Sequence, residues 1–428
     1  MKYKTSQFNI TVPVERSDEV ILFNTKECSF VVLDKKNKSF LTNIDDISTY
    51  EEDVVSNLIE LGFLVDENLD EIENLKQQTK KARISSESLS LTIATTLDCN
   101  MNCYYCFEKK NQQYLSTDVA DKIINYIFER LSSGQFKKLL IVWTGGEPLL
   151  NKNIIEYIST PIIQFCSDKE IEYHGSIITN GLLLNEETVK FLKNMHVRDG
   201  QVTVDGLEKT HNERRLSVDN LNSFQIIIDN IKTAYKYLSI GIRVNIDCNN
   251  KNEIKDLLDY LYKSLDYNNN NNLSVILAQV NGCTTTLPEQ EYFEFLRDIF
   301  NMHITDSKLE KNYPVPLNFA CGVQCKDSLV IAPDGYVYKC WEEIGIKEFS
   351  IGTIEKINDD CKINQKYLAD MWPVECDSCT YLPMCHGGCP MRRGKNNNKP
   401  LCASQAKTLD IYLKRYYKLW EKENEATS

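Results

Sequence analysis

The pattern of apolar and polar residues changes near residue 89, where six short apolar segments begin to alternate with amphipathic stretches. Such alternation is typical of parallel strands joined by crossover helices. Six strands of this kind suit an open, partial (β/α)6 barrel, and the predicted fold class is α/β. The predicted strands are SLTIATT, KLLIVWT, HGSIITN, QVTVDG, IGIRVNID and LSVILAQV, and the predicted helices lie near 117–132, 152–167, 186–195, 220–238 and 251–265.

The first 80 or so residues follow a different pattern. Short alternating or apolar runs (QFNITV, VILFNT, SFVVLD) precede a predicted helix from Glu51 to Leu61 and a strand-like GFLVDE. This order predicts a small α+β module. A charged stretch, ENLDEIENLKQQTKKARISSES, follows as a polar helix or linker.

After about residue 310 the alternation stops, and cysteines separated by Gly and Pro take its place. Metal ligands can stabilise such a segment where an apolar core cannot. A helical pattern, SQAKTLDIYLKRYYKLWEKENE, follows it. We therefore expect three domains, at 1–85, 86–310 and 311–428.

Charge and hydropathy exclude some classes of function. A net charge of -12 and a pI near 5.1 argue against wide contact with nucleic acid, whose backbone requires a basic surface. The first residues lack the apolar core of a signal peptide, and no run of 18 or more apolar residues follows. The expected location is cytoplasmic, without membrane contact.

Sixteen cysteines favour metal or redox chemistry over disulfides in a reducing compartment. Three fall at 99–106, and eight more form a group between 321 and 402 that leaves out Cys361. The other five are expected to be small buried apolar residues: Cys28, Cys166, Cys248, Cys283 and Cys361.

The segment TTLDCNMNCYYCFE places Cys99, Cys103 and Cys106 directly after the first strand of the series. Three thiolates can hold three irons of a 4Fe-4S cluster and leave the fourth iron open to an external chelate. A zinc loop is the alternative, although zinc sites require four ligands.

This C-x3-C-x2-C motif, with Tyr105 before its last cysteine, resembles the radical S-adenosylmethionine superfamily, and so does the later WTGGEPLL. The resemblance implies a catalytic 4Fe-4S cluster on the three cysteines that reductively cleaves S-adenosylmethionine to a 5′-deoxyadenosyl radical. It implies a reductant such as flavodoxin or ferredoxin as partner. Residues matching the family's cosubstrate contacts are Tyr105, Gly145, Gly146, Glu147, Pro148, Thr179, Asn180, Asp205 and Arg215.

The C-terminal cysteines resemble the SPASM domain, which carries auxiliary 4Fe-4S clusters in radical enzymes that act on peptides and proteins. The resemblance implies three clusters in total. Zinc is again the alternative, and Cys321 could be a spectator that leaves one auxiliary iron open. By the family pattern, Cys321, Cys325, Cys340 and Cys389 would bind the first auxiliary cluster, and Cys376, Cys379, Cys385 and Cys402 the second.

The N-terminal module resembles the winged-helix-like recognition domain of peptide maturases, which binds a leader peptide as an added strand. The resemblance implies a maturase of a ribosomally made precursor peptide, with a thioether between a cysteine sulfur and a carbon as the expected product. A sulfatase-maturating enzyme is the alternative, but that family tends to have an aspartate base where this chain has Trp341. A non-catalytic iron–sulfur carrier is a third possibility, against which the GGEP segment argues.

Overall fold

The computed structural model describes residues 2–14, 18–34, 52–84, 87–303 and 313–427. The chain forms two compact units, each built from separate stretches of sequence. The first contains residues 1–84, 293–324 and 370–428, and the second contains residues 85–292 and 325–369. The predicted domain boundaries at 85/86 and 310/311 fall outside the described residues, so the three-domain division stays a prediction.

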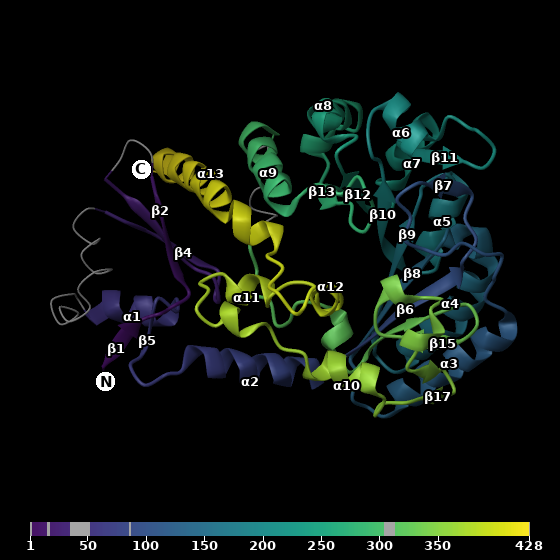
Figure 1. Cartoon of the computed structure of the whole chain (residues 1–428), viewed down its shortest axis with the longest axis horizontal. Coiled ribbons are helices and arrows are strands. Elements are labelled where there is room, and N and C mark those ends of the chain that lie inside the picture. The colour runs from purple at the N-terminus through teal and green to yellow at the C-terminus, as the bar shows by residue number, and fades with distance from the viewer. Residues whose placement is uncertain (1, 15–17, 35–51, 85–86, 304–312, 428) are drawn as a thin grey trace. The chain divides into compact units, whose positions relative to one another are not determined.

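The second unit is organised around a ten-stranded sheet with the order β13-β12-β10-β9-β8-β6-β14-β15-β16-β17 (Figure 1). The six strands from β13 to β6 are mutually parallel, which confirms a mostly parallel α/β sheet. They match the six predicted segments: β6 (Ser88–Thr96), β8 (Lys138–Gly145), β9 (Glu172–Thr179), β10 (Val197–Thr203), β12 (Ser239–Ile246) and β13 (Leu273–Gln279).

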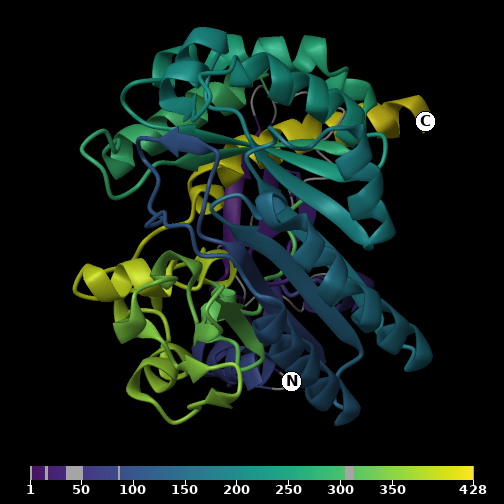
Figure 2. The same cartoon turned by 90° about the vertical axis from the view of Figure 1, so that its right-hand side faces the viewer.

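The crossover helices pack along the sheet (Figures 1 and 2). In α3, Ser116 caps the first turn, and an apolar stripe from Ala120 to Leu131 is buried. α7 is shorter than predicted because Asn222 caps its start by accepting from the Gln225 amide. The helices of this series are α3 (Thr117–Ser132), α4 (Lys152–Asp168), α5 (Glu186–Asn194), α6 (Glu208–Arg214), α7 (Ser223–Ala234) and α8 (Ile254–Ser264).

Two further pieces of sheet complete this unit. A two-stranded antiparallel ribbon joins β7 (Met101–Cys103) to β11 (Arg215–Ser217), with Arg215 opposite Cys103. The main sheet is also extended past β6, first by a parallel strand and then by antiparallel ones. These are β14 (Ser328–Ile331), β15 (Tyr336–Tyr338), β16 (Gly352–Thr353) and β17 (Lys356–Ile357), followed by α10 (Lys362–Ala369).

The first unit contains a three-stranded antiparallel sheet in the order β2-β3-β4, and β1 paired with β5. One face of the larger sheet, through Ile21 and Phe23 of β3, packs against Leu409 and Leu413 of the C-terminal helix α13. The other face, through Leu22, packs near Phe63. The strands are β1 (Tyr3–Thr5), β2 (Asn9–Pro13), β3 (Val20–Asn24), β4 (Ser29–Leu33) and β5 (Leu64–Asp66).

The charged stretch that was predicted as a polar helix or a linker is a helix, α2, of 14 residues. The helices of the first unit are α1 (Glu52–Glu60), α2 (Glu71–Ile84), α11 (Leu382–Cys385), α12 (Pro390–Lys395) and α13 (Ser404–Thr427), and α9 (Glu289–His303) runs from the second unit into the first. Over the described ranges, none of the helices has the length and apolar character needed to span a membrane.

The prediction for the five scattered cysteines is correct only in part. Cys28 and Cys166 are buried, but Cys283 and Cys361 are half-buried and Cys248 is exposed. Cys248 lies in the turn that follows β12, where the chain leaves the sheet.

Candidate active site at the carboxyl edge of the sheet

The three cysteines of the first motif lie just after β6, at the carboxyl edge of the parallel strands, where such sheets place their chemistry. Cys99 and Cys103 are half-buried and Cys106 is exposed. Burial is the main cause that raises the pKa of the Cys99 thiol to about 12, and the nearby Glu147 and Cys103 contribute to this rise. Burial also raises the pKa of Cys106, to which Cys103 contributes. Cys103 therefore lies near both Cys99 and Cys106.

The GGEP turn is fitted tightly against this loop. The Gly146 amide donates to the Thr96 carbonyl at 3.0 Å, and the Glu147 amide donates to the Asp98 carbonyl at 2.9 Å. A Cβ on Gly146 would lie 2.2 Å from the Asp98 oxygen, and Gly145 has a φ of +124°. The two glycines are therefore required by the close approach of the backbone that leads into the cysteine loop.

The Glu147 carboxylate joins the GGEP turn to the ITNG segment. It accepts from the Thr179 hydroxyl at 2.8 Å, from the Asn180 amide at 2.8 Å and from the Leu149 amide at 3.1 Å. Burial raises the pKa of Glu147, and these donors oppose that rise. Both carboxylate oxygens serve the protein itself, so Glu147 and Thr179 position the site's backbone. Pro148 opens the short 3-10 helix that follows.

Tyr105, Asp205 and Arg215 form one buried network. Arg215 donates to the Tyr105 hydroxyl at 2.7 Å, and that hydroxyl donates to Asp205. Burial alone would lower the pKa of Arg215, but Cys103, Tyr105 and Asp205 raise it overall. The Arg215 Nε is buried and has no hydrogen-bond partner among the described residues, so the guanidinium can still receive an anionic group such as a carboxylate.

A second network repeats this arrangement, and sequence reasoning missed it. Arg214 donates to the Tyr104 hydroxyl at 2.6 Å and to Asp247 at 2.7 Å, and Tyr104 donates to Asp247. Asp247 is fully buried, and its pKa is lowered because hydrogen bonds from Arg214 and Tyr104 outweigh burial. Thr285 donates to the same carboxylate at 2.8 Å. The adjacent tyrosines 104–105 and the adjacent arginines 214–215 could have indicated this second network, because each tyrosine is hydrogen-bonded to one of the arginines.

The C-terminal cysteines divide between the two units. Cys325 and Cys340 are buried in the second unit, whereas Cys321 and Cys389 belong to the first. The four-ligand set predicted for one auxiliary cluster therefore stays a prediction.

The other four, Cys376, Cys379, Cys385 and Cys402, lie together in the first unit. Burial is the main cause that raises the pKa of Cys376 to about 11, and Cys385, Cys379 and Cys402 each contribute to this rise. Such mutual effects require that the thiols be neighbours, as the ligands of one cluster are. In the described part of the chain, no three His, Cys, Asp or Glu side chains are arranged to hold a single metal ion.

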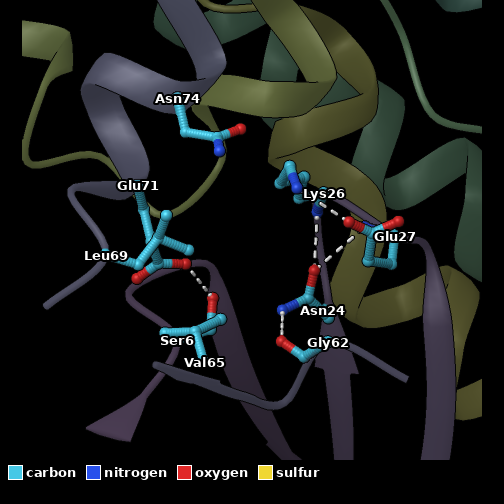
Figure 3. Close-up of a pocket in the computed structure, with 9 residues that line it drawn as sticks. All are labelled: Ser6, Asn24, Lys26, Glu27, Gly62, Val65, Leu69, Glu71 and Asn74. Carbon is cyan, nitrogen blue, oxygen red and sulfur yellow. Dashed lines mark hydrogen bonds and ion pairs between the residues drawn. The ribbon is translucent and has the colours of Figure 1, made fainter. Parts of the chain in front are cut away.

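The N-terminal module contains a small polar pocket between the β3–β4 turn and the start of α2 (Figure 3). The buried Glu71 closes one side, where it accepts from the Ser6 hydroxyl at 2.6 Å and the Gln7 amide at 2.9 Å. The pocket is lined by Ser6, Asn24, Lys26, Glu27, Gly62, Val65, Leu69, Glu71 and Asn74.

Comparison with known proteins assigns the parallel sheet of the second unit to a protein family. Residues 93–261 match the model of the Radical SAM superfamily. The chain therefore carries a Radical SAM domain on its parallel sheet, and it is an enzyme of the radical SAM type.

Two relatives and one solved structure extend the similarity beyond this domain. A cysteine-type anaerobic sulfatase-maturating enzyme of Clostridium novyi is 26% identical over 73% of this chain and 90% of its own length. The radical SAM cyclopropyl synthase TigE of Paramaledivibacter caminithermalis is 25% identical over 83% of this chain and 80% of its own. The fold is similar to Streptococcus suis SuiB bound to its precursor peptide SuiA, with a TM-score of 0.51 at 16% identity, over 94% of this chain and 99% of that one.

Proposed function

We propose that this chain is a maturase that oxidatively modifies a ribosomally made precursor peptide by joining a cysteine sulfur to a carbon. Bound S-adenosylmethionine and an open 4Fe-4S cluster would supply the 5′-deoxyadenosyl radical that removes the substrate hydrogen. Cys99, Cys103 and Cys106 would hold that cluster. Residues 145–148 would approach the cosubstrate through their backbone, and Arg215 would receive its carboxylate.

The observation that carries the choice of a peptide substrate is the edge strand β4. Within the described ranges β4 pairs only with β3, and its residues from Ser29 to Leu33 are all half-buried. Such an edge presents unpaired N–H and C=O groups to an added strand. The opposite edge strand, β2, ends in Pro13, which cannot donate. A leader peptide would therefore extend the sheet at β4.

The second set of thiols fits the chemistry that follows hydrogen removal. Forming a carbon–sulfur bond from a carbon radical and a thiolate leaves one surplus electron, which an auxiliary cluster can accept. Cys376, Cys379, Cys385 and Cys402 would hold one such cluster. Cys321, Cys325, Cys340 and Cys389 would hold the other, which makes three 4Fe-4S clusters with the catalytic one.

A sulfatase-maturating activity is the second candidate, because the Clostridium novyi relative is matched over 90% of its length. The chain has the half-exposed Trp341 after Cys340, where that family tends to place an aspartate base. The two functions differ in their product: sulfur is retained in a thioether and lost when cysteine becomes formylglycine.

The triple variant Cys99→Ala/Cys103→Ala/Cys106→Ala tests the assigned catalytic cluster. With dithionite as reductant, the parent should convert S-adenosylmethionine to 5′-deoxyadenosine, and the variant should form none while keeping about two thirds of the iron. Formation of 5′-deoxyadenosine by the variant at the parent's rate would show that another set of thiols holds the open cluster. Replacing the buried Cys166 by Ala provides a control outside all three sites.

A further inference from the structure

Asn180, the first residue after β9, places its side-chain amide against a thiol of the cysteine loop. Its Nδ2 lies 3.8 Å from the Cys99 sulfur and donates to the Asn100 Oδ1 at 2.7 Å. An amide nitrogen carries two protons, so it can serve both acceptors at the same time. The side chain is 7% exposed, which keeps water from competing for these bonds.

Neighbouring hydrogen bonds fix the orientation of this amide. Its Oδ1 accepts from the Leu182 amide at 2.9 Å, and only an oxygen can accept at that position. The Asn180 backbone amide donates to Glu147 at 2.8 Å and holds the residue from the other side. The nitrogen must therefore face the Cys99 sulfur.

An N–H group directed at a cluster-ligating sulfur changes the cluster's reduction potential. Adding an electron increases the negative charge on the sulfurs, and a hydrogen-bond donor stabilises the reduced state more than the oxidised state. The potential rises as a result. In this type of enzyme that rise matters, because the reaction begins when one electron from an external donor enters the cluster.

We propose that Asn180 is a positioning residue that acts through Cys99 to raise the reduction potential of the catalytic cluster. This role differs from the cosubstrate contact that the sequence predicts for Asn180. It rests on the proposed function in one respect, namely that Cys99 is a ligand of the open cluster. One electron is transferred to the cluster, and Asn180 neither gains nor loses a proton.

Two leucine variants test the proposal. Asn180→Leu removes the N–H donor. Asn230→Leu is the matched control, because Asn230 of α7 donates to the carbonyls of Gly181 and Leu182 at 2.8 and 3.2 Å and so supports the same turn. The readout is an anaerobic redox titration with dithionite, followed by electron paramagnetic resonance before S-adenosylmethionine is added. The catalytic cluster is identified as the signal that changes on later addition of S-adenosylmethionine and is missing from the triple cysteine variant.

At a fixed potential, Asn180→Leu should show a roughly tenfold lower ratio of reduced to oxidised catalytic cluster, equivalent to about 59 mV for one electron. Asn230→Leu should titrate like the parent. If Asn180→Leu does not load iron, Asn180→Asp serves in its place, because it keeps the oxygen that accepts from Leu182 and lacks the N–H donor. Its ratio of reduced to oxidised catalytic cluster should also fall. A parental potential in the Asn180 variants, or an equal shift in Asn230→Leu, would overturn the proposal. A parent with no signal responsive to S-adenosylmethionine would instead contradict the proposed function.

Discussion

Arg215 and Tyr105 are joined by a hydrogen bond of 2.7 Å between the guanidinium and the phenol, and Tyr105 directly precedes Cys106. The bond connects the end of α6 to the cysteine loop. The neighbouring pair, Arg214 and Tyr104, makes the same kind of bond at 2.6 Å. Each tyrosine hydroxyl donates a hydrogen bond to a different aspartate, Asp205 or Asp247. The loop is therefore anchored twice, to the ends of two strands.

We expect Arg215→Gln to weaken binding of S-adenosylmethionine by about 10- to 100-fold, because a charge-assisted hydrogen bond contributes about 1.5–3 kcal/mol. Equilibrium dialysis of the reconstituted protein with labelled cosubstrate would measure the change. Arg198→Gln is the control, since that arginine is exposed and pairs with Glu172 at 3.7 Å. Equal affinity of the Arg215 variant and the parent would remove Arg215 from the cosubstrate site.

The second network should contribute mainly to stability. Arg214 and Asp247 are 4% and 0% exposed, so Arg214→Gln leaves a buried carboxylate without its cation. We expect the free energy of unfolding to fall by about 3 kcal/mol, measured by urea denaturation of the cluster-free chain. The control, Lys190→Gln, breaks an exposed pair with Glu186 at 2.8 Å and should cost less than about 1 kcal/mol. Similar losses in the two variants would show that Asp247 keeps enough donors without Arg214.

Anaerobically reconstituted protein should hold about twelve irons, because three cubane clusters contain four irons each. Iron and acid-labile sulfide analysis would measure this content. About eight irons would leave only one auxiliary cluster. Stoichiometric zinc with about four irons would show that the C-terminal cysteines form zinc sites.

Strand addition at β4 can be tested with two adjacent proline variants, Val31→Pro and Val32→Pro. Neighbouring N–H groups of an edge strand point in opposite directions, one toward β3 and the other outward. Proline is tolerated where the N–H points outward. We expect one variant to fold like the parent and to bind the leader peptide at least tenfold more weakly by fluorescence anisotropy. If either proline variant is stably folded and binds the leader peptide as tightly as the parent, the β4 edge is not the binding site.

Deleting residues 1–80 would not be a selective test of leader binding by the N-terminal module. Phe8 and Leu75 pack in one core cluster with Trp372 and Leu382. The Thr25 hydroxyl also donates to the Thr380 carbonyl. Removing the module would expose this core next to Cys376 and Cys379, so loss of iron could follow from unfolding alone.

The parallel sheet could be predicted because each strand, such as β8 or β12, is a short apolar run between helices with clear polar faces. The cysteine ligands could be predicted because they follow one another at short, characteristic spacings in the sequence. The Arg214–Asp247 pair could not, because its members are 33 residues apart and meet only when the sheet is formed. The same holds for α13, whose packing against β2 and β3 joins opposite ends of the chain.

The role of Glu147 also required the structure. The sequence places it in a cosubstrate turn, whereas its carboxylate accepts from Thr179 and Asn180 and is fully buried. A motif identifies which residues belong to a site, but hydrogen-bond partners decide which of them face the ligand. Asn180 illustrates the same limit, because its contact with Cys99 spans 81 positions.

The central claim is tested most directly by mass spectrometry of a cysteine-containing peptide encoded beside this gene. The peptide would be incubated anaerobically with the reconstituted enzyme, dithionite and S-adenosylmethionine. We expect a product that has lost two hydrogens and kept its sulfur, with one 5′-deoxyadenosine formed for each modification. Fragmentation should place a crosslink at the cysteine. An unchanged peptide with no 5′-deoxyadenosine would contradict the account, and a product that has lost its sulfur would favour the sulfatase-maturating activity.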